Sequence, residues 1–334
     1  MSEGSPKCPV CGSRETKPVE RWRDPVAGKD YDLLECAGCG LVYAWPLVFP
    51  GGEWYEKFNY VDGYAETAAQ ASKTDFAYFL DLLPADRRGR MLDVGCAAGH
   101  FLRMAAARGY EVEGLEVDDR FVKMARDAGT PVTKGILDEA FATVRAGTCD
   151  VVSMLEVLEH VDDPRGFLTL AARILKPGGR LLVAVPDNRR PTPFGRDYFD
   201  YPPHHLTRWK PEPMRRALES AGLRVEDLTA KPFPVIDLSR IWADRSAQFL
   251  LRVYKRLRYG REAAARPMSE ILAAGAPAGA APSPSNKEAR LKLVYFYHDV
   301  FNTVTWPLFG LMTAYYRLTR PDMGHTLLAV ARKD

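Results

Sequence analysis

Short apolar runs alternate with segments of helical periodicity between residues 89 and 238. The apolar runs predict β-strands and the periodic segments predict helices, because side chains repeat every two residues in a strand and every 3.6 in a helix. Strands are expected at 90–94, 112–117, 150–155, 180–185 and 223–228, and helices at 101–108, 118–128 and 164–175. Strands separated by helices favour a parallel sheet that binds ligands at the carboxyl ends of its strands. The chemistry is therefore expected on the loops after the strands.

Two expected helices start at residues that are typical of helix ends. Asp118 or Asp119 can accept a backbone N–H at the start of one helix, and Asp163 followed by Pro164 suits the start of the next. The sequence Pro-Gly-Gly at 177–179 predicts a turn before the strand that follows.

The loop after the first expected strand combines small residues with an acidic residue on the next strand. Residues 95–99, Gly-Cys-Ala-Ala-Gly, let the backbone approach a ligand closely, and a helix is expected directly after them. Glu116 ends the second expected strand, where a carboxylate can accept ribose hydroxyls. A dinucleotide-binding loop requires a glycine where His100 stands, and a Walker loop requires Gly-Lys-Ser/Thr, which this loop lacks. The pattern indicates a nucleoside-containing ligand of another kind.

Four stretches in a fixed order resemble class I S-adenosylmethionine-dependent methyltransferases, close to the ubiquinone-biosynthesis O-methyltransferase group. They are Leu-Asp-Val-Gly-Cys-Ala-Ala-Gly at 92–99, Val-Glu-Gly-Leu-Glu at 112–116, Leu-Glu-Val-Leu-Glu-His-Val at 155–161 and Leu-Lys-Pro-Gly-Gly at 175–179. The resemblance covers about residues 75–230. It implies an α/β fold with a Rossmann-like sheet, helices on both faces and S-adenosylmethionine as cofactor. Ala97 stands where the family's first motif has its middle glycine.

The resemblance also implies which residues hold the cofactor. Glu116 is expected at the ribose, and Ile136 and Leu137 beside the adenine. Apart from the resemblance, Tyr60 and Tyr64, in an aromatic stretch before the first strand, are expected to close over the cofactor. The full predicted set, beginning at the methionine end, is Asp93, Gly95, Cys96, Ala97, Gly99, Glu116, Val117, Ile136, Leu137, Leu155, Glu156 and Tyr64.

Two Cys-x-x-Cys pairs near the N-terminus predict a structural zinc site. Cys8 and Cys11 lie on one expected turn and Cys36 and Cys39 on another, and two such turns can aim four thiolates at one ion. Four sulfur ligands leave no open position, so the expected Zn²⁺ stabilises the fold and takes no part in catalysis. Iron ligation or a redox role is the alternative. The Gly-Leu-Val-Tyr segment after Cys39 resembles the zinc modules of sugar C-methyltransferases more than those of ribosomal-RNA methyltransferases.

The segment 197–209 contains the candidate catalytic residues, His205 and its neighbour His204. It is expected to lie over the cofactor's methyl group, where a histidine with a pKa near neutrality can take a proton from an acceptor hydroxyl. The alternative is that His205 only holds this loop on the core. A similar loop in sugar C-methyltransferases carries an acidic residue, a histidine and an aromatic residue four positions on. His205 and Trp209 match that pattern, while His204 replaces the acid.

A long insertion precedes an apolar run at 324–332 that resembles the family's last, antiparallel strand. The insertion consists of a basic aromatic stretch, a flexible stretch rich in Ala, Pro, Gly and Ser, and an apolar stretch, at 240–261, 262–290 and 291–317. A basic helix beside an apolar one can lie in a membrane interface. We therefore expect a helical cap that contacts lipid at its surface, with cap helices packed on the core or a homodimer interface as alternatives.

These observations divide the chain into five parts. They are a zinc-ribbon module (1–45), an aromatic connector and lid (46–88), the methyltransferase core (89–238), a helical cap insertion (239–320) and the final strand of the core (321–334). The polar N-terminus lacks the apolar stretch of a signal peptide, so a cytoplasmic location is expected, with the inner face of the membrane as an alternative.

The expected function is O- or C-methylation of a small-molecule, sugar or lipid-linked acceptor. One alternative is an RNA methyltransferase that binds RNA through its zinc module, and another is a cofactor-binding regulator without catalysis. The 334 residues carry a formal net charge of only +3, which gives no overall attraction to nucleic acid. Base N-methylation of the Asp/Asn-Pro-Pro-aromatic kind is disfavoured, because that position holds Leu-Glu-Val-Leu at 155–158.

Overall fold

The computed structural model describes residues 6–25, 27–52, 54, 76–83, 88–190, 196, 198–231, 310–311, 314–315, 318–319 and 323–334. The chain divides into two units, one made of Met1–Pro191, Arg196–Lys231 and Asp322–Asp334 and the other of Thr192–Gly195 and Pro232–Pro321. All strands named below belong to the first unit. The predictions for Tyr60 and Tyr64, for 240–261, for 262–290 and for most of 291–317 lie outside the described residues.

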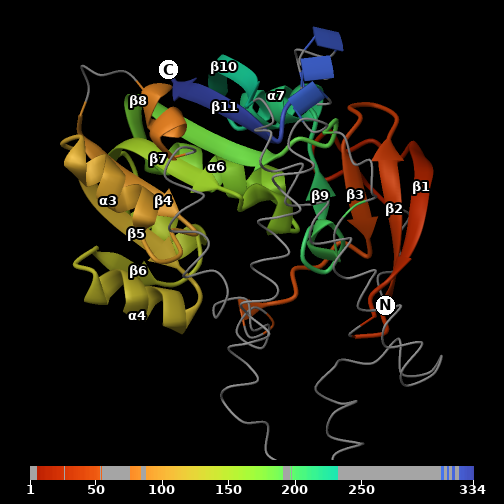
Figure 1. The fold of residues 1–334 in the computed structure, drawn as a ribbon, viewed down its shortest axis with the longest axis horizontal. Helices are drawn as coiled ribbons and strands as arrows, with labels where there is room; N and C mark the ends of the chain where they lie inside the picture. Colours follow the sequence, from red (N-terminus) through yellow and green to blue (C-terminus); the bar gives the residue numbers. More distant parts are fainter. Residues whose placement is uncertain are drawn as a thin grey trace, which may run out of the picture. The chain divides into compact units, whose positions relative to one another are not determined.

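A sheet of seven strands forms the centre of the first unit (Figure 1). Its order is β10 (Leu223–Lys231), β11 (Thr326–Lys333), β8 (Leu175–Pro186), β7 (Cys149–Leu155), β4 (Arg90–Val94), β5 (Glu111–Glu116) and β6 (Val132–Lys134). The pairs from β8 to β6 are parallel, whereas β11 is antiparallel to both of its neighbours. The chain runs from β4 to β5 on one side and to β7 on the other, so the strand order reverses at β4, where such sheets bind ligands. The predicted Rossmann-like α/β fold is confirmed.

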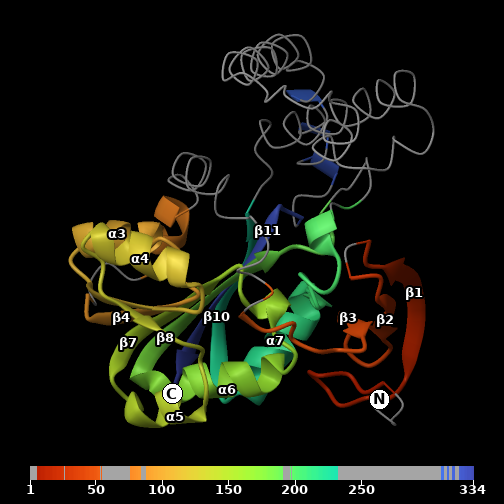
Figure 2. The same ribbon diagram turned by 90° about the horizontal axis from the view of Figure 1, so that it is seen from below.

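Helices cover both faces of this sheet (Figure 2). On one face lie α3 (His100–Ala107) and α4 (Asp119–Asp127), and on the other α5 (Glu139–Val144), α6 (Pro164–Ile174) and α7 (Pro211–Ser220). The predicted caps are confirmed: Asp118 accepts the N–H of Arg120 at the start of α4, and Asp163 accepts that of Gly166 in α6. Each cap satisfies a backbone donor that has no partner within its helix.

The turn predicted at 177–179 is instead part of β8. Cys149 pairs with Leu175 and Val151 with Arg180, so the register between β7 and β8 shifts across these residues. Gly178 has a φ of 78°, which glycine adopts without steric cost. The Pro-Gly-Gly segment therefore forms an irregularity within one strand, where the sequence pattern predicts a break.

A second sheet contains the N-terminal strands β1 (Thr16–Arg23), β2 (Asp30–Cys36) and β3 (Val42–Trp45) and a short strand from the core, β9 (Thr207–Arg208). All of its pairs are antiparallel. Two 3₁₀ turns, η1 (Leu158–His160) and η2 (Tyr198–Asp200), precede β9 in the chain. The N-terminal strands and the core are thus joined through β9.

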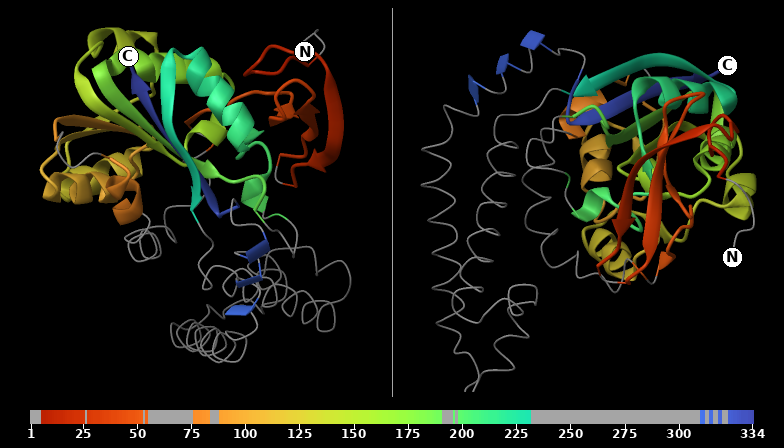
Figure 3. Two further views of the ribbon diagram at one scale, coloured as in Figure 1. Left: turned by 90° about the horizontal axis from the view of Figure 1, so that it is seen from above. Right: turned by 90° about the vertical axis from the view of Figure 1, so that its right-hand side faces the viewer.

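The insertion leaves the core after β10 and returns at β11, which lies between β10 and β8 (Figure 3). The last antiparallel strand predicted at 324–332 is thereby confirmed as β11. Residues 76–81, ahead of β4, are helical. Within the described part of the chain, no helix combines the length and apolarity needed to cross a membrane.

Candidate active site

The loop between β4 and α3 has a left-handed backbone at three positions. The φ angle is 72° at Gly95, 45° at Ala97 and 72° at Gly99. A Cβ atom on Gly95 would lie 2.5 Å from Cγ2 of Val157, so both the backbone conformation and the available space require glycine there. The turn brings the loop backbone against the residues that follow β7.

Glu116, at the end of β5, binds the backbone of two loops. Its Oε2 accepts the N–H of Ala97 at 2.8 Å, and its Oε1 accepts those of Val117 at 2.8 Å and Asp118 at 2.9 Å. Burial raises the pKa of Glu116, while these hydrogen bonds oppose the rise. A carboxylate offers about four acceptor positions, so Glu116 retains capacity for a ligand hydroxyl.

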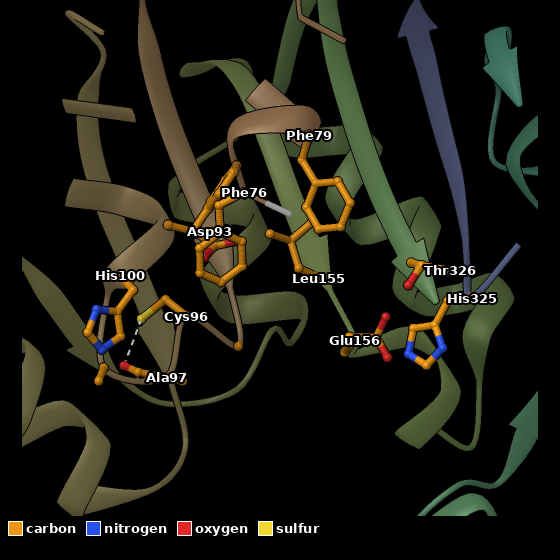
Figure 4. A pocket seen from close by; sticks show the side chains of 13 residues that line it. Phe76, Phe79, Asp93, Cys96, Ala97, His100, Leu155, Glu156, His325 and Thr326 are labelled. Atoms are coloured by element: carbon orange, nitrogen blue, oxygen red, sulfur yellow. Dashed lines mark hydrogen bonds between the residues drawn. The ribbon is translucent and has the colours of Figure 1, made fainter. Parts of the chain in front are cut away.

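Two cavities meet at the carboxyl ends of the central strands. The smaller, of about 300 Å³, is lined by the predicted residues Asp93 and Cys96 together with Phe76, Phe79, His100, Phe101 and others (Figure 4). The larger, of about 490 Å³, is lined by the predicted residues Glu116, Val117, Ile136, Leu137, His204 and His205 among others. Both cavities share Gly95, Ala97, Leu155, Glu156 and His325. Residues expected around the two halves of a nucleoside-containing cofactor thus line two adjoining spaces.

Gly99 is the described member of the predicted set that lines neither cavity. It directly precedes α3, where a Cβ atom would lie 3.0 Å from Cγ2 of Thr130. Gly99 allows a tight turn into α3. Its contact with a ligand remains a prediction. Tyr64, the remaining member, is outside the described residues.

Two carboxyl groups line the smaller cavity, the buried Asp93 and the exposed Glu156. Asp93 accepts the hydroxyl of Ser153 at 2.7 Å, and burial raises the pKa of Asp93 to about 7. The surrounding protein atoms likewise raise the pKa of Glu156, although its side chain is exposed to solvent, and its backbone has a φ of 58°. A positively charged ligand beside them would favour the carboxylate forms.

Three neighbouring imidazoles form a cluster at the larger cavity, which His325 also lines. His160 lies in η1, and His204 and His205 follow η2. The Nδ1 atom of His160 is 2.7 Å from the carbonyl oxygen of His204, and that of His204 is 2.9 Å from the carbonyl oxygen of Phe199. Burial lowers the pKa of all three imidazoles, that of His204 to about 3. The cluster is therefore neutral at pH 7.

The geometry of the cluster suits acid–base chemistry better than metal ligation. Ligand atoms of the three side chains lie within 4.8 Å of one another. However, the rings of His204 and His205 stack at an interplanar angle of 28°, so their in-plane lone pairs run side by side. A zinc ion requires ring nitrogens that converge at about 2.0–2.1 Å. The stacked rings of His204 and His205 do not provide that convergence.

Asp200 provides a carboxylate partner for His205. Its Oδ1 lies 3.6 Å from Nδ1 of His205 and also accepts a hydrogen bond from Arg190. Burial alone would raise the pKa of Asp200, but His205 and Arg190 outweigh it and hold that pKa well below the ordinary value. Burial lowers the pKa of His205, and the charge of Asp200 opposes that effect. An ionised Asp200 can therefore stabilise the imidazolium that forms when His205 accepts a proton.

Glu159 lies behind the imidazoles and is 1% exposed. Its Oε1 atom is 3.9 Å from Nε2 of both His160 and His205. Neither carboxyl oxygen has a hydrogen-bond partner among the described residues. Burial, together with the neighbouring Glu156, raises the pKa of Glu159 well above its ordinary value. Its surroundings therefore favour the protonated form of this side chain.

The four predicted zinc ligands form one cluster in the N-terminal part, made of Cys8, Cys11, Cys36 and Cys39. The Sγ atoms of Cys8 and Cys39 are 3.6 Å apart, and those of Cys11 and Cys36 are 3.4 Å apart. Gly12 and Gly40 occupy equivalent turns, with φ angles of 75° and 77°. Two similar turns that bring four sulfur atoms together match a tetrahedral ion, so the cluster is consistent with structural zinc.

Four further side chains at the site were not singled out by the sequence: Glu159, Arg190, Asp200 and His325. Glu159 lies within one of the family-like stretches, which is a local signal for it. His325 directly precedes β11, so its place at both cavities depends on β11 inserting between β8 and β10. The apolar run at 324–332 indicates the strand itself, but not the contact of His325 with the two cavities.

The comparisons with known proteins concern the central part of the chain. A family model described as a methyltransferase domain matches residues 64–228. The ubiquinone biosynthesis O-methyltransferase of Thiobacillus denitrificans is 30% identical over 178 residues, which cover 48% of this chain and 76% of the relative. Its counterpart in Marinobacter nauticus is 32% identical over 180 residues, which cover 48% of this chain and 75% of that protein.

Solved structures are similar over a larger share of the chain. A chain from the complex between the Haloferax volcanii Trm112 methyltransferase activator and a methyltransferase aligns with 80% of this chain and 95% of its own length, at 17% identity and a TM-score of 0.47. The cysteine cluster precedes the residues that the family model matches. The sequence relationships therefore support the methyltransferase fold of the core and its use of S-adenosylmethionine.

Proposed function

The chain belongs to the class I S-adenosylmethionine-dependent methyltransferases, and on this premise we propose that it methylates a hydroxyl group of a largely apolar small molecule, with His205 as the general base. S-adenosylmethionine is the cofactor of this family and, when bound, supplies a methyl group on a positively charged sulfur. One observation carries the proposal: the same cavity of about 490 Å³ is lined by Glu116 and by His205. The carboxylate expected at the ribose and the proposed base thus line the same cavity.

The residues present fit the cofactor. The left-handed turn through Gly95 and Ala97 leaves room for close approach to the backbone, and Glu116 keeps acceptor capacity for a ribose hydroxyl. Ile136 and Leu137 offer apolar contact for a base ring at the same cavity. The carboxyl groups that border the smaller cavity suit the positively charged end of the ligand.

His205 has the partners that a general base needs. Its lowered pKa keeps the imidazole neutral at pH 7, so it is ready to accept a proton. Asp200 lies beside Nδ1, so we assign the proton transfer from an acceptor hydroxyl to Nε2, which also lies 3.9 Å from Oε1 of Glu159. The resulting imidazolium then faces the ionised carboxylate of Asp200, which stabilises the charge.

The walls of the larger cavity favour an acceptor that is mostly apolar. Aromatic and aliphatic side chains contribute much of its lining, namely Phe49, Phe121, Val157, Val161, Phe167 and Phe199. Arg190, Asp200 and the histidines provide polar groups. The names of the ubiquinone biosynthesis O-methyltransferases support O-methylation of a small molecule. Sugar and lipid-linked acceptors, and transfer to carbon, are alternatives within the same reaction class.

Exposed apolar side chains in the insertion support contact with a lipid surface. Leu311, Tyr315 and Leu318 are 70%, 62% and 83% exposed, and their spacing puts them on one side of a helix. Such a face suits the interface of a membrane. Co-sedimentation with anionic vesicles tests this part: binding that is lost in a Leu311→Glu/Leu318→Glu variant supports it, whereas no sedimentation of the wild type contradicts it.

Methyl transfer from labelled S-adenosylmethionine to separated small-molecule, lipid, glycan and RNA fractions tests the main proposal. We expect product in the small-molecule or lipid fraction, and a loss of about 100-fold in His205→Ala, which is within the usual contribution of a general base. Calorimetry with S-adenosylhomocysteine is the control, because His205→Ala should still bind it and Glu116→Ala should not. Transfer mainly to RNA, or full activity of His205→Ala, would overturn the proposal.

A further inference from the structure

We propose that Glu20 and Trp22 of β1 are positioning residues for the histidine loop, defined as residues 198–206, so that the N-terminal sheet holds His205 in its working position. The inference rests on the proposed function, in which His205 is the base. It assigns to the N-terminal sheet a part in catalysis that zinc binding alone would not require. Three sets of contacts carry it.

The first is a strand shared between the N-terminal sheet and the core. β9 pairs with β3, with Thr207 opposite Tyr43 and Arg208 opposite Val42 (Figure 1). The N–H of Ala44 donates to the carbonyl oxygen of Leu206 at 2.8 Å. Because Leu206 directly follows His205, the backbone next to the base belongs to the hydrogen-bonded edge of the N-terminal sheet.

The second set of contacts is made by Trp22. Its indole stacks on the ring of Tyr201, with centroids 4.1 Å apart and an interplanar angle of 16°. Its Nε1–H donates to the carbonyl oxygen of Pro202 at 3.0 Å. The carbonyl oxygen of Tyr201 in turn accepts the N–H groups of both His204 and His205 at 3.1 Å. Trp22 therefore holds Tyr201 in place, and Tyr201 holds the backbone of both histidines.

Glu20 contacts Tyr201 directly and Asp200 through Arg208. Its Oε1 accepts from Nη1 of Arg208 at 2.8 Å, and its Oε2 accepts the hydroxyl of Tyr201 at 3.2 Å. Arg208 also donates from Nε and Nη2 to the carbonyl oxygen of Asp200, both at 3.3 Å. Arg208 is 7% exposed, so water competes little for these bonds. Glu20 thus orients Arg208, and Arg208 holds the residue whose carboxylate faces His205.

Successive side chains of a strand point to opposite faces, and β1 therefore supplies a matched control. Glu20 and Trp22 contact the histidine loop, whereas Arg21 between them is 74% exposed and pairs with Asp30 at 3.8 Å. Arg21→Ala changes the same strand without touching the loop. Trp22→Phe keeps an aromatic ring for stacking but removes the indole donor, and so separates the two contacts.

Kinetics of the full-length, zinc-loaded protein form the first test. We expect Trp22→Ala and Glu20→Gln to lower kcat about tenfold, because small misplacements of a catalytic group are costly, and to move the acidic limb of the kcat–pH profile. Trp22→Phe should recover most of kcat, and Arg21→Ala should match the wild type. The Kd for S-adenosylhomocysteine and the zinc content should not change in any of them. A kcat and pH profile unchanged in both Trp22→Ala and Glu20→Gln would overturn the proposal.

A second measurement does not depend on finding the acceptor. Histidine ring resonances followed by NMR, with His205 assigned through His205→Gln, report the titration of the base directly. The charged and titratable groups that face it are Glu159, His160, Arg190, Asp200, His204 and Arg208. We expect His205 to titrate at lower pH in Glu20→Gln and Trp22→Ala, because its contact with Asp200 loosens. An unshifted titration in both variants would refute the positioning role, whereas absent turnover in the wild type would refute only the proposed function.

Discussion

The Nδ1 atom of His205 lies 3.6 Å from Oδ1 of Asp200, and this contact supplies the acid–histidine pair that position 204 does not provide. The residue at 204 is itself a histidine, held neutral by burial. The acid comes from the end of η2, and the turn in which the carbonyl of Tyr201 accepts the N–H of His205 brings the two side chains together. In the proposed mechanism, the base and its counter-ion therefore come from the same loop.

Two substitutions should shift the pH dependence of kcat in opposite directions. His205 must be neutral to accept a proton, so the rate rises as pH increases through its pKa, which burial places below the ordinary value. Asp200 raises that pKa and Arg190 lowers it. Asp200→Asn should therefore move the acidic limb to lower pH, and Arg190→Gln should move it to higher pH. Asp200→Asn should also lower kcat by about 10- to 100-fold, because the imidazolium loses its counter-ion.

Steady-state rates between pH 4.5 and 8, with S-adenosylmethionine saturating, measure both shifts. Asp127→Asn is the control for charge removal, because Asp127 lies in α4 and pairs only with Lys123 in an exposed i,i+4 contact among the interactions described. If the acidic limb of the kcat–pH profile stays in place in both Asp200→Asn and Arg190→Gln, or moves in the same direction in both, His205 is not the titrating base.

The residues that line the two cavities on the expected cofactor side could be found in the sequence because their signals are local. Glu116 ends a strand and Gly95 begins a turn, and each stands where a single β–loop–α unit fixes its position. The same holds for the cysteine pairs, since a Cys-x-x-Cys turn places both sulfur atoms by itself. Residues that work within one short segment can be assigned from spacing alone.

The acceptor side depends on contacts that spacing does not report. Asp200 meets His205 only through the folded turn of the histidine loop, and Glu20 reaches the loop from the other end of the chain. The irregularity in β8 has a similar origin: tertiary pairing with β7 extends the strand through Pro-Gly-Gly, which favours a turn in isolation. These features follow from packing between distant segments, which one sequence does not encode locally.

Replacing Glu159 by glutamine should stabilise the protein at high pH. The folded-state pKa of Glu159 is raised by burial, so its protonated form supports folding below the unfolded pKa, and that support is lost as pH rises through the folded pKa. Glutamine has nearly the same shape and no charge to bury. We expect Glu159→Gln to gain about 1–3 kcal/mol of unfolding free energy near pH 9, with a smaller gain near pH 5.

Urea unfolding at the two pH values measures this difference. Glu139→Gln, at the exposed start of α5, is the matched control and should show no pH-dependent gain. Equal effects of Glu159→Gln at pH 5 and pH 9 would mean that the buried carboxyl does not change its protonation on unfolding. Activity should fall in the same variant if the acid helps to hold His205, because Oε1 is 3.9 Å from Nε2 of that residue.

Zinc should be present at about one equivalent per chain and should be held by the cysteines alone. Elemental analysis is expected to show its loss in Cys36→Ser and its retention in Cys149→Ser and His204→Ala, because Cys149 lies in β7 and His204 in the histidine loop. A second equivalent that disappears in His204→Ala would place a metal at the three imidazoles and contradict the proton-transfer role proposed for His205.

Loss of zinc should impair methyl transfer more than cofactor binding. Cys36 ends β2, which pairs with β3, and β3 pairs with β9 directly after the histidine loop. The Glu116 loop, by contrast, receives its hydrogen bonds from the core. Chelation or Cys36→Ser should therefore lower kcat while the Kd for S-adenosylhomocysteine changes little. It should also lower Tm by about 5 °C or more, since about 1 kcal/mol corresponds to about 2–4 °C in a domain of this size. An unchanged kcat in a zinc-free protein that remains folded would show that the N-terminal sheet holds the loop without its metal.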